Sequence, residues 1–323
     1  MPDISVCVPS HDRPLRLRWL LNALEEQTLD RDRFEVVVAH DSAGPETEEL
    51  LTTHPLAKAG VLRHLTFAPG PGPAQKRNAA WRAARAPLVV FTDDDCRPPA
   101  EWLERALDAA HSHPGAIVQG ATAVDPDEEV VRLHAPHARF QVVDPPVIWA
   151  QTCNIVYPRD VLEACGGFDE ALPVAAGEDT DLALRARAAG TPYVGAPEVL
   201  TYHAVEPASL VVRAREVWRW QHLPYLARRH PQVREPMPLR IFWKRTHARL
   251  PLMLAGALLI ARRRPLLGLL LALPWVAESL PAYGRSPRGI LRALSELPGH
   301  ALIDLVEFAA LVRGSARHRS LLL

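Results

Sequence analysis

Cysteine is scarce in this sequence, and its arrangement excludes two common roles. The four cysteines, Cys7, Cys96, Cys153 and Cys165, are scattered along the chain, and no two of them form a CxxC pair. Structural zinc sites and redox-active thiols use that spacing, whereas small secreted domains carry a dense disulfide framework. We therefore expect a reduced, cytosolic protein without structural disulfides.

Glycine-rich phosphate-binding motifs and long apolar runs are also missing. Neither GxGxxG nor GxxxxGK[ST] occurs, so the sequence supports neither a dinucleotide-binding fold nor a P-loop. The two most apolar stretches, 250–261 and 265–277, hold 12 and 13 uncharged residues. A transmembrane helix needs about 20, so each stretch is too short to span a bilayer alone. The first residues read as a β-strand and not as a secretion signal.

Net charge is zero, but the charges are unevenly distributed. Residues 1–212 hold 18 Lys/Arg and 31 Asp/Glu, whereas residues 213–264, the basic collar, hold 13 and 2. An acidic body beside a basic collar indicates a neighbouring anionic surface. Nucleic acid could use such a collar, but the adjacent apolar stretches favour a membrane, and we expect no nucleic-acid partner.

Strand and helix patterns alternate over the first hundred residues. Strands are expected at 4–8, 34–39, 61–67 and 88–92, and helices at 14–27, 46–53 and 74–85. This βαβαβαβ order predicts a parallel α/β sheet with right-handed crossovers. We expect residues 1–235 to form one domain and residues 236–323 to form a helical, membrane-associating region.

The strand at 88–92 runs directly into three acids, Asp93, Asp94 and Asp95. Side chains two apart on an extended segment point the same way, so Asp93 and Asp95 should converge. Like charges held that close repel each other unless a cation lies between them. At the carboxyl end of a buried strand, the pair predicts a site for Mg²⁺ or Mn²⁺. The alternative is a solvated acidic turn that caps the helix starting near Pro98.

Polar residues follow the other strands too, where open α/β sheets bind their ligands. Asp12 and Asp41 would accept hydrogen bonds from a nucleoside base or ribose. Lys76 and Arg77 start a helix after the Pro/Gly-rich loop at 69–73, and would hold phosphates together with the helix N-terminus.

Five short motifs, taken in order, resemble those of family 2 glycosyltransferases with the GT-A fold. They are Val6–Arg13, Lys76–Ala79, Phe91–Asp95, Gly166–Glu170 and Gly177–Asp181. The resemblance implies a mostly parallel sheet flanked by helices, to which the C-terminal helices form an appendage. It also implies metal-dependent transfer of a sugar from a nucleoside diphosphate to an acceptor hydroxyl, with inversion at the anomeric carbon.

The resemblance assigns roles to the matching positions. Asp93 and Asp95 would hold the metal on the diphosphate. Apart from the resemblance, His203 ends a late strand and would complete the metal shell or touch the diphosphate, unless it is a structural histidine. Asp179 would be the general base, unless it and Asp181 are only acids favoured at a helix N-terminus. The substrate-binding positions would be Pro9, Asp12, Arg13, Asp41, Lys76, Arg77, Asn78, Asp94, Asn154 and Glu178.

Two departures and two rival functions qualify this interpretation. The family often has an acid at the position of His40 and an asparagine at that of Asp12, which leaves the nucleoside base open. Aspartate-nucleophile phosphohydrolases also have a DxD after a strand, but need Thr or Val where this chain has Arg97. A catalytically silent nucleotide-sugar-binding or scaffold protein fits the same motifs.

The C-terminal region favours an interfacial or re-entrant hairpin at a membrane surface, with Trp243 and Trp275 near the headgroups. A further apolar helix is expected at 301–312, with Asp304 and Glu307 on one edge. The active site would then face the cytoplasm, and the acceptor would be lipid-linked or a cell-envelope glycan. The alternative is a soluble helical domain or a dimer interface.

Overall fold

Two units make up the chain, residues 1–207 and residues 208–323. The computed structural model describes residues 1–70, 72–172, 174–281 and 283–323. Pro71 of the Pro/Gly-rich loop therefore lies outside the described residues. The second unit begins before Pro236, where the apolar composition starts, because residues 208–235 pack with the C-terminal helix. Arg228 and Arg234, for example, donate hydrogen bonds to the carbonyl groups of His318 and Leu321.

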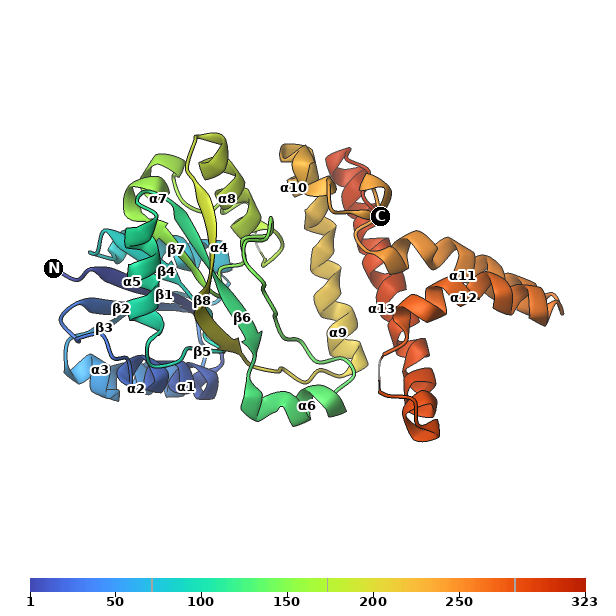
Figure 1. Ribbon diagram of the computed structural model, residues 1–323, viewed down its shortest axis with the longest axis horizontal. Coiled ribbons are helices and arrows are strands. Elements are labelled where there is room, and N and C mark those ends of the chain that lie inside the picture. Colours follow the sequence, from blue (N-terminus) through green and yellow to red (C-terminus); the bar gives the residue numbers. More distant parts are fainter. Residues whose placement is uncertain (71, 173, 282) are drawn as a thin grey trace. The chain divides into compact units, whose positions relative to one another are not determined.

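The first unit opens with the predicted alternation of strands and helices (Figure 1). Its four parallel strands stand in the order β3-β2-β1-β4. Each connecting helix has proline in its first turn, where the missing N–H costs nothing. The strands are β1 (Ile4–Ser10), β2 (Phe34–His40), β3 (Leu62–Thr66) and β4 (Leu88–Phe91), and the helices are α1 (Pro14–Glu25), α2 (Pro45–Thr53), α3 (Pro55–Lys58) and α4 (Pro73–Ala83).

The rest of this unit makes the sheet mixed. Strand β7 runs antiparallel to β4 and β6, and the eight strands are ordered β3-β2-β1-β4-β7-β6-β8-β5. The predicted fold class is confirmed, with a parallel first half and a mixed second half. The elements are β5 (Cys96–Arg97), α5 (Trp102–Ser112), β6 (Ile117–Val124), α6 (Glu129–His134), β7 (Ile155–Pro158), α7 (Arg159–Cys165), α8 (Glu178–Ala188) and β8 (Tyr193–His203).

The core lies on both faces of the sheet, which is why the strands lack an alternating pattern. Strands β1 and β2 are buried at every position. Val6 and Val8 pack with leucines of α1 and α2 on one face, while Cys7, between them, packs with Phe91 and Trp81 on the other. Helices therefore cover both faces, and the carboxyl edge of the sheet is left for a site.

The described residues of the second unit form helices and the loops between them. Helices α11 and α12 form a hairpin (Figure 1), and they approach so closely that a Cβ on Gly256 would lie 2.5 Å from the carbonyl oxygen of Gly268. Among the described residues, no helix is both long enough and apolar enough to cross a membrane. The helices are α9 (Leu210–Val217), α10 (Leu223–Arg229), α11 (Arg245–Ala261), α12 (Pro265–Ser279) and α13 (Pro287–His318).

A buried polar network joins α11, α12 and α13 at the base of the hairpin. Lys244, just before α11, pairs with both Asp304 and Glu307 of α13, which share one edge as predicted. The indole Nε1 of Trp275 donates to Asp304 Oδ2 at 3.0 Å. Trp275 was expected near lipid headgroups, and this placement is wrong because its ring is buried and its N–H satisfies a buried carboxylate.

Glu35 of β2 ties the parallel strands together, and this generates a stability prediction. Its buried carboxylate accepts hydrogen bonds from Ser5 (2.7 Å), Arg63 (2.8 Å) and Arg85. Burial opposes ionisation, but these hydrogen bonds prevail and lower the pKa of Glu35 to about 2. The stabilisation is complete above the unfolded-state pKa and is lost as the pH falls through the folded-state pKa.

We expect Glu35→Gln to destabilise the fold at pH 7 by on the order of 3 kcal/mol. The deficit should shrink as the pH is lowered from about 4.5 to about 2, because wild-type Glu35 then becomes protonated. Denaturant unfolding at several pH values measures this difference, with Glu49→Gln, at an exposed acid of α2, as the matched control. A deficit that does not change with pH would contradict the prediction.

Candidate active site

The acids that follow β4 meet a histidine from the end of β8. One ligand atom from each of Asp93, Asp95 and His203 lies within 4.8 Å of the others. The β5–β8 pairing places Cys96 opposite His203, which brings the imidazole beside the acid run. The Nε2 atom of His203 is 3.5 Å from Asp95 Oδ1. The structure thus brings together the three residues predicted to hold a metal.

His203 is held in the tautomer that a metal ligand needs. Its Nδ1 lies 2.7 Å from the carbonyl oxygen of Ala204, which can only accept, so Nδ1 carries the proton. The other ring nitrogen, Nε2, faces the carboxylate of Asp95 and is the atom that would bind an ion. A backbone carbonyl that fixes the far nitrogen is the usual outer contact of metal-binding histidines. Two carboxylates and one such imidazole fit a divalent cation such as Mn²⁺ or Mg²⁺.

Asp94, between the two candidate ligands, points toward β1 instead. It accepts a hydrogen bond from Ser10 Oγ at 2.7 Å, and Arg13 Nη1 lies 3.3 Å from its other oxygen. Burial, together with the charge of Asp95, raises the pKa of Asp94 to about 6. Arg13 also pairs with Asp95 at 2.6 Å, so this arginine joins the opening turn to the acid run.

Arg77 is the cation at the centre of the site. Its buried guanidinium contacts Asp93 Oδ1 at 2.8 Å, Glu178 Oε1 at 2.9 Å and Asp179 Oδ1 at 3.3 Å. Burial alone would lower the pKa of Arg77, but the three carboxylates raise it. The structure places the guanidinium of Arg77 on carboxylates from the acid run after β4 and from α8. Its phosphate-binding role stays a prediction.

Asp179 is the second residue of α8, which begins directly after Gly177, whose φ is 107°. Besides Arg77, the backbone N–H of Thr152 donates to its Oδ2 at 3.1 Å. Its side chain is 20% exposed. Burial, and then the charge of Glu178, raises the pKa of Asp179 to about 7. A carboxylate with a pKa near neutrality and one accessible edge is suited to accept a proton.

Asp181, by contrast, behaves as a structural helix acid. It is fully buried, and its Oδ2 accepts a hydrogen bond from Arg185 Nε at 2.7 Å, four residues along the same helix. The alternative interpretation of these two acids as helix-terminal residues therefore describes Asp181, whereas Asp179 faces Arg77 and the acid run.

The turns after β1 and β2 form the predicted nucleoside side of the site. Asp41 accepts from Lys76 Nζ at 2.6 Å and lies 2.9 Å from His11 Nδ1. Burial opposes the ionisation of Asp41, but Lys76 lowers its pKa overall. Asp12, at a positive φ of 49°, accepts from the N–H of Ala43 at 2.8 Å. Lys76 therefore neutralises Asp41, and its phosphate-binding role stays a prediction.

Three other predicted substrate-binding residues lie in the scaffold around the site. Pro9 is buried in β1. The side chain of Asn154 donates to the carbonyl oxygens of Ala121 and Val199. Asn78 donates to the carbonyl oxygen of Phe168 and accepts from its N–H, which fixes the loop after α7. The contact of these three residues with substrate stays a prediction.

Two glycines in this loop have positive φ, Gly166 at 72° and Gly167 at 77°. Gly166 ends α7, and a Cβ there would meet nothing within 4 Å. A Cβ on Gly167 would lie 2.3 Å from Asn78 Oδ1 and 2.8 Å from Trp81 Nε1. Only Gly167 is therefore required for the close approach of the loop to α4.

Sequence reasoning missed two participants. His11 contacts Asp41 through its ring, and its side chain is largely exposed at the rim of the site. Thr152 positions Asp179 through its backbone N–H, which no residue type reveals. The position of His11 in the turn between β1 and α1, next to the predicted nucleoside-binding residue Asp12, is a signal in the sequence that could have indicated it.

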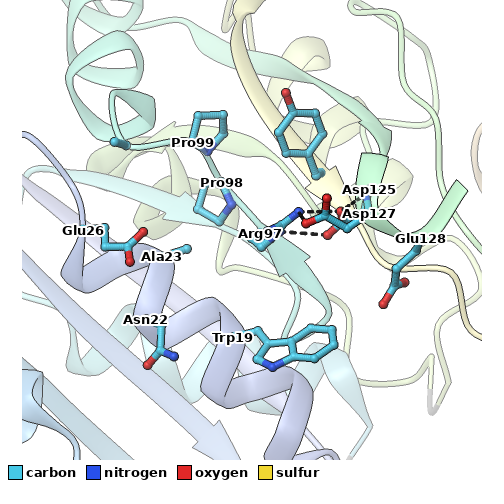
Figure 2. Close-up of a pocket in the computed structure, with 12 residues that line it drawn as sticks. Trp19, Asn22, Ala23, Glu26, Arg97, Pro98, Pro99, Asp125, Asp127 and Glu128 are labelled. Atoms are coloured by element: carbon cyan, nitrogen blue, oxygen red, sulfur yellow. Dashed lines mark hydrogen bonds and ion pairs between the residues drawn. The ribbon is translucent and has the colours of Figure 1, made fainter.

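A cavity of about 640 Å³ has neither Asp93 nor Asp95 among its lining residues (Figure 2). Trp19 and Asn22 of α1, Pro98 and Tyr202 line it, and Arg97 lies within it, paired with Asp125 at 2.6 Å. Tyr202 and His203 are consecutive on β8, so their side chains leave opposite faces of the sheet. The cavity is therefore not part of the cluster around Asp93 and Asp95.

Comparison with known proteins gives a consistent family. The family model "Glycosyl transferase family 2" matches residues 5–168. Validoxylamine A glucosyltransferase of Streptomyces hygroscopicus subsp. jinggangensis is 28% identical over 225 residues, covering 59% of this chain and 53% of that protein. This chain thus spans about half the length of the first curated relatives that it matches.

Two solved structures share the fold over nearly the whole chain. TarS 1-349 of S. aureus in complex with UDP is 17% identical with a TM-score of 0.54, covering 99% of this chain and 92% of that one. The mannosyltransferase PcManGT from Pyrobaculum calidifontis, in complex with GDP-Man and Mn²⁺, is 21% identical with a TM-score of 0.56, covering 98% and 87%. At these identities the likeness shows the fold alone.

The surroundings of Asp179 predict an unusual titration. In metal-free protein, its carboxyl should titrate near pH 7, because burial and the charge of Glu178 favour the protonated form. Carbon-13 NMR of labelled aspartate carboxyls measures this pKa, with Asp179→Asn assigning the signal. Glu178→Gln should lower the pKa, since it removes a neighbouring negative charge. A wild-type pKa in the ordinary aspartate range, or no change in Glu178→Gln, would refute this account.

Proposed function

Because the chain belongs to glycosyl transferase family 2, we propose that it transfers a sugar from a nucleoside diphosphate sugar to an acceptor hydroxyl with inversion. The observation that carries this proposal is the arrangement around Arg77. One buried guanidinium joins the candidate metal ligand Asp93 to the candidate base Asp179. The nucleotide-sugar complexes of structural neighbours with the same GT-A fold support the choice of donor.

Metal dependence is part of the proposal. Asp93, Asp95 and His203 would hold the ion, Mn²⁺ or Mg²⁺, and the complex of PcManGT with Mn²⁺ supports this choice. When bound, such a cation supplies Lewis-acid neutralisation of the charge that develops on the departing nucleoside diphosphate.

The protein's own residues account for the acceptor side. Asp179, oriented by the N–H of Thr152 and by Arg77, takes the proton of the acceptor hydroxyl. The acceptor oxygen then forms its bond to the anomeric carbon as the bond from that carbon to the diphosphate oxygen breaks. The base must act on the face of the sugar opposite the leaving group, so the product is inverted. Asp41 and Asp12 would bind the nucleoside at the other end.

The two rival functions differ from this proposal in one feature each. Arg97, at the position where a phosphohydrolase needs Thr or Val, is engaged with Asp125 and Asp127. A carboxylate whose pKa is raised to about 7, paired with the same arginine as the metal-ligand candidate Asp93, favours a catalytic role over silent binding.

The acceptor and the location are proposals drawn from the second unit. Leu266 and Leu270 of α12 are 77% and 66% exposed, and Arg262, Arg263 and Arg264 are exposed where α12 follows α11. Fifteen residues of helix measure roughly 22 Å, less than the roughly 30 Å of a bilayer core. We propose that this hairpin lies in the interface of the cytoplasmic leaflet, and that the acceptor is lipid-linked or a cell-envelope glycan.

The transfer proposal predicts a division of effects between two variants. Wild-type protein should turn over a nucleotide sugar from a panel with Mn²⁺, and excess chelator should abolish turnover. Asp179→Asn should reduce kcat by about 10²- to 10⁴-fold with little change in donor KM, because the lost interaction belongs to the transition state. Asp95→Asn should lose both activity and metal-dependent donor binding.

The exposed acid of α5, in Asp108→Asn, is the matched control for these measurements and should retain wild-type rates. Full activity in chelator would exclude the metal assignment. Donor binding without turnover by wild-type protein, over a panel that includes lipid acceptors, would favour the silent binding protein instead.

The location proposal predicts binding to anionic membranes. Full-length protein should float with anionic liposomes at low salt and less so at high salt, because each basic residue near the surface contributes about 1 kcal/mol. Replacing Arg262, Arg263 and Arg264 with Gln should weaken flotation, whereas replacing the equally exposed Arg31, Arg33 and Arg82 of the first unit should not. If the protein does not float with the liposomes at low salt, the location proposal is wrong and the hairpin is a surface for packing against protein.

A further inference from the structure

Three side chains gather at the outer edge of the sheet, where no predicted site residue lies. They are His40 at the end of β2, His64 of β3 and Glu48 of α2. Glu48 Oε2 is 3.2 Å from His40 Nε2, and Glu48 Oε1 is 2.9 Å from His64 Nε2. One ligand atom from each lies within 4.8 Å of the others.

The sheet register explains why the two imidazoles meet. His40 is paired with Thr66, and His64 lies two residues before Thr66 on the same strand. Side chains two apart share a face, and paired residues on neighbouring strands do too, so both rings project from one face. Their centroids are 5.9 Å apart. Helix α2 covers this edge and supplies Glu48 from its first turn.

We propose that His40, His64 and Glu48 form a second cation site, which binds a borderline-soft divalent ion such as Zn²⁺. Two imidazoles and one carboxylate are a common protein ligand set for zinc. With bond lengths of about 2.0–2.2 Å in a tetrahedron, neighbouring ligand atoms stand roughly 3.3 Å apart. The two N–O separations, 3.2 Å to Oε2 and 2.9 Å to Oε1 of Glu48, are close to that value, and all three ligands lie within 4.8 Å of one another.

The fourth position is accessible to water. The side chains of Glu48 and His64 are 48% and 23% exposed, so the cluster opens to solvent on their side. The side chain of His40 is only 2% exposed and closes the cluster on the opposite side. Thr66 Oγ1 lies 3.3 Å from His40 Nε2 and 3.3 Å from Glu48 Oε2, where it supports both ligands.

A second cluster in the chain shows what a self-neutralised site looks like. His247, Asp304 and Glu307 also lie within ligand distance of one another. There the ammonium of Lys244 contacts both carboxylates, so the protein supplies its own cation. Within the described residues, the ion pairs to Glu48 come from His40 and His64 alone, and no Lys or Arg takes that place.

An ion at this place would cross-link α2, β2 and β3. His40 immediately precedes Asp41, which anchors Lys76 and His11 in the turn after β2. The site would therefore stabilise the edge that carries the proposed nucleoside-binding acid. It is distinct from the cluster of Asp93, Asp95 and His203 and does not depend on the transfer reaction.

Zinc binding to metal-free, full-length protein tests the proposal, measured by competition with a chromophoric chelator. Wild type and Asp95→Asn should both bind Zn²⁺ at this site with equal affinity. His64→Ala and Glu48→Gln should weaken it by at least about tenfold, since they remove a ligand. Glu49→Gln, which changes the next residue of the same helix, should bind as wild type does.

Two further readouts distinguish a bound ion from loss of fold. Co²⁺ in place of Zn²⁺ should give wild type and Asp95→Asn the visible absorption of a four-coordinate site, which His64→Ala should lose. Zn²⁺ should raise the Tm of wild type, because it binds only the folded state, and raise that of Glu48→Gln less. Equal zinc affinity in wild type, His64→Ala and Glu48→Gln would overturn the proposal, as would zinc binding that only Asp95→Asn abolishes.

Discussion

The buried guanidinium of Arg77 is the interaction on which the rest of the site depends. Three carboxylates from the acid run and from α8 surround it, and its positive charge offsets the cost of placing them so close together. Arginine suits this position because it stays charged when buried and presents several donors in a fixed fork. Asp93 and Asp179 share this counter-ion, so a change of charge at one is felt at the other.

The sequence predicted the scaffold of the site well, because strand ends and helix starts have local signals. Apolar runs located β1, β2 and β4, and the helices expected from residues 14 and 74 correspond to α1 and α4, which begin at Pro14 and Pro73. Asp93 and Asp95 come together as expected, but through a turn closed by the hydrogen bond from the N–H of Cys96 to the carbonyl oxygen of Asp93, and not through alternation along a strand. Each of these arguments uses only residues close to one another in the chain.

The partners of the charged residues could not be predicted in the same way. Lys76 meets Asp41 and Arg77 meets Glu178 across long sequence separations, and the choice among several nearby acids is made by packing. Helix α13 runs for 32 residues, whereas the apolar pattern at 301–312 indicated only its central part. Pro298 lies inside α13 and does not end it, because a proline within a helix is tolerated where neighbouring elements support the backbone.

The two neighbouring glycines after α7, Gly166 and Gly167, should tolerate substitution to different degrees during evolution. Both have positive φ, but open space surrounds the missing side chain of Gly166, while that of Gly167 would collide with Asn78 and Trp81. Asparagine or aspartate, which tolerate left-handed backbone, can replace the first at small cost. The second can change only together with α4. Across homologues, Gly166 should therefore vary on its own, whereas Gly167 should vary only in concert with positions 78 and 81.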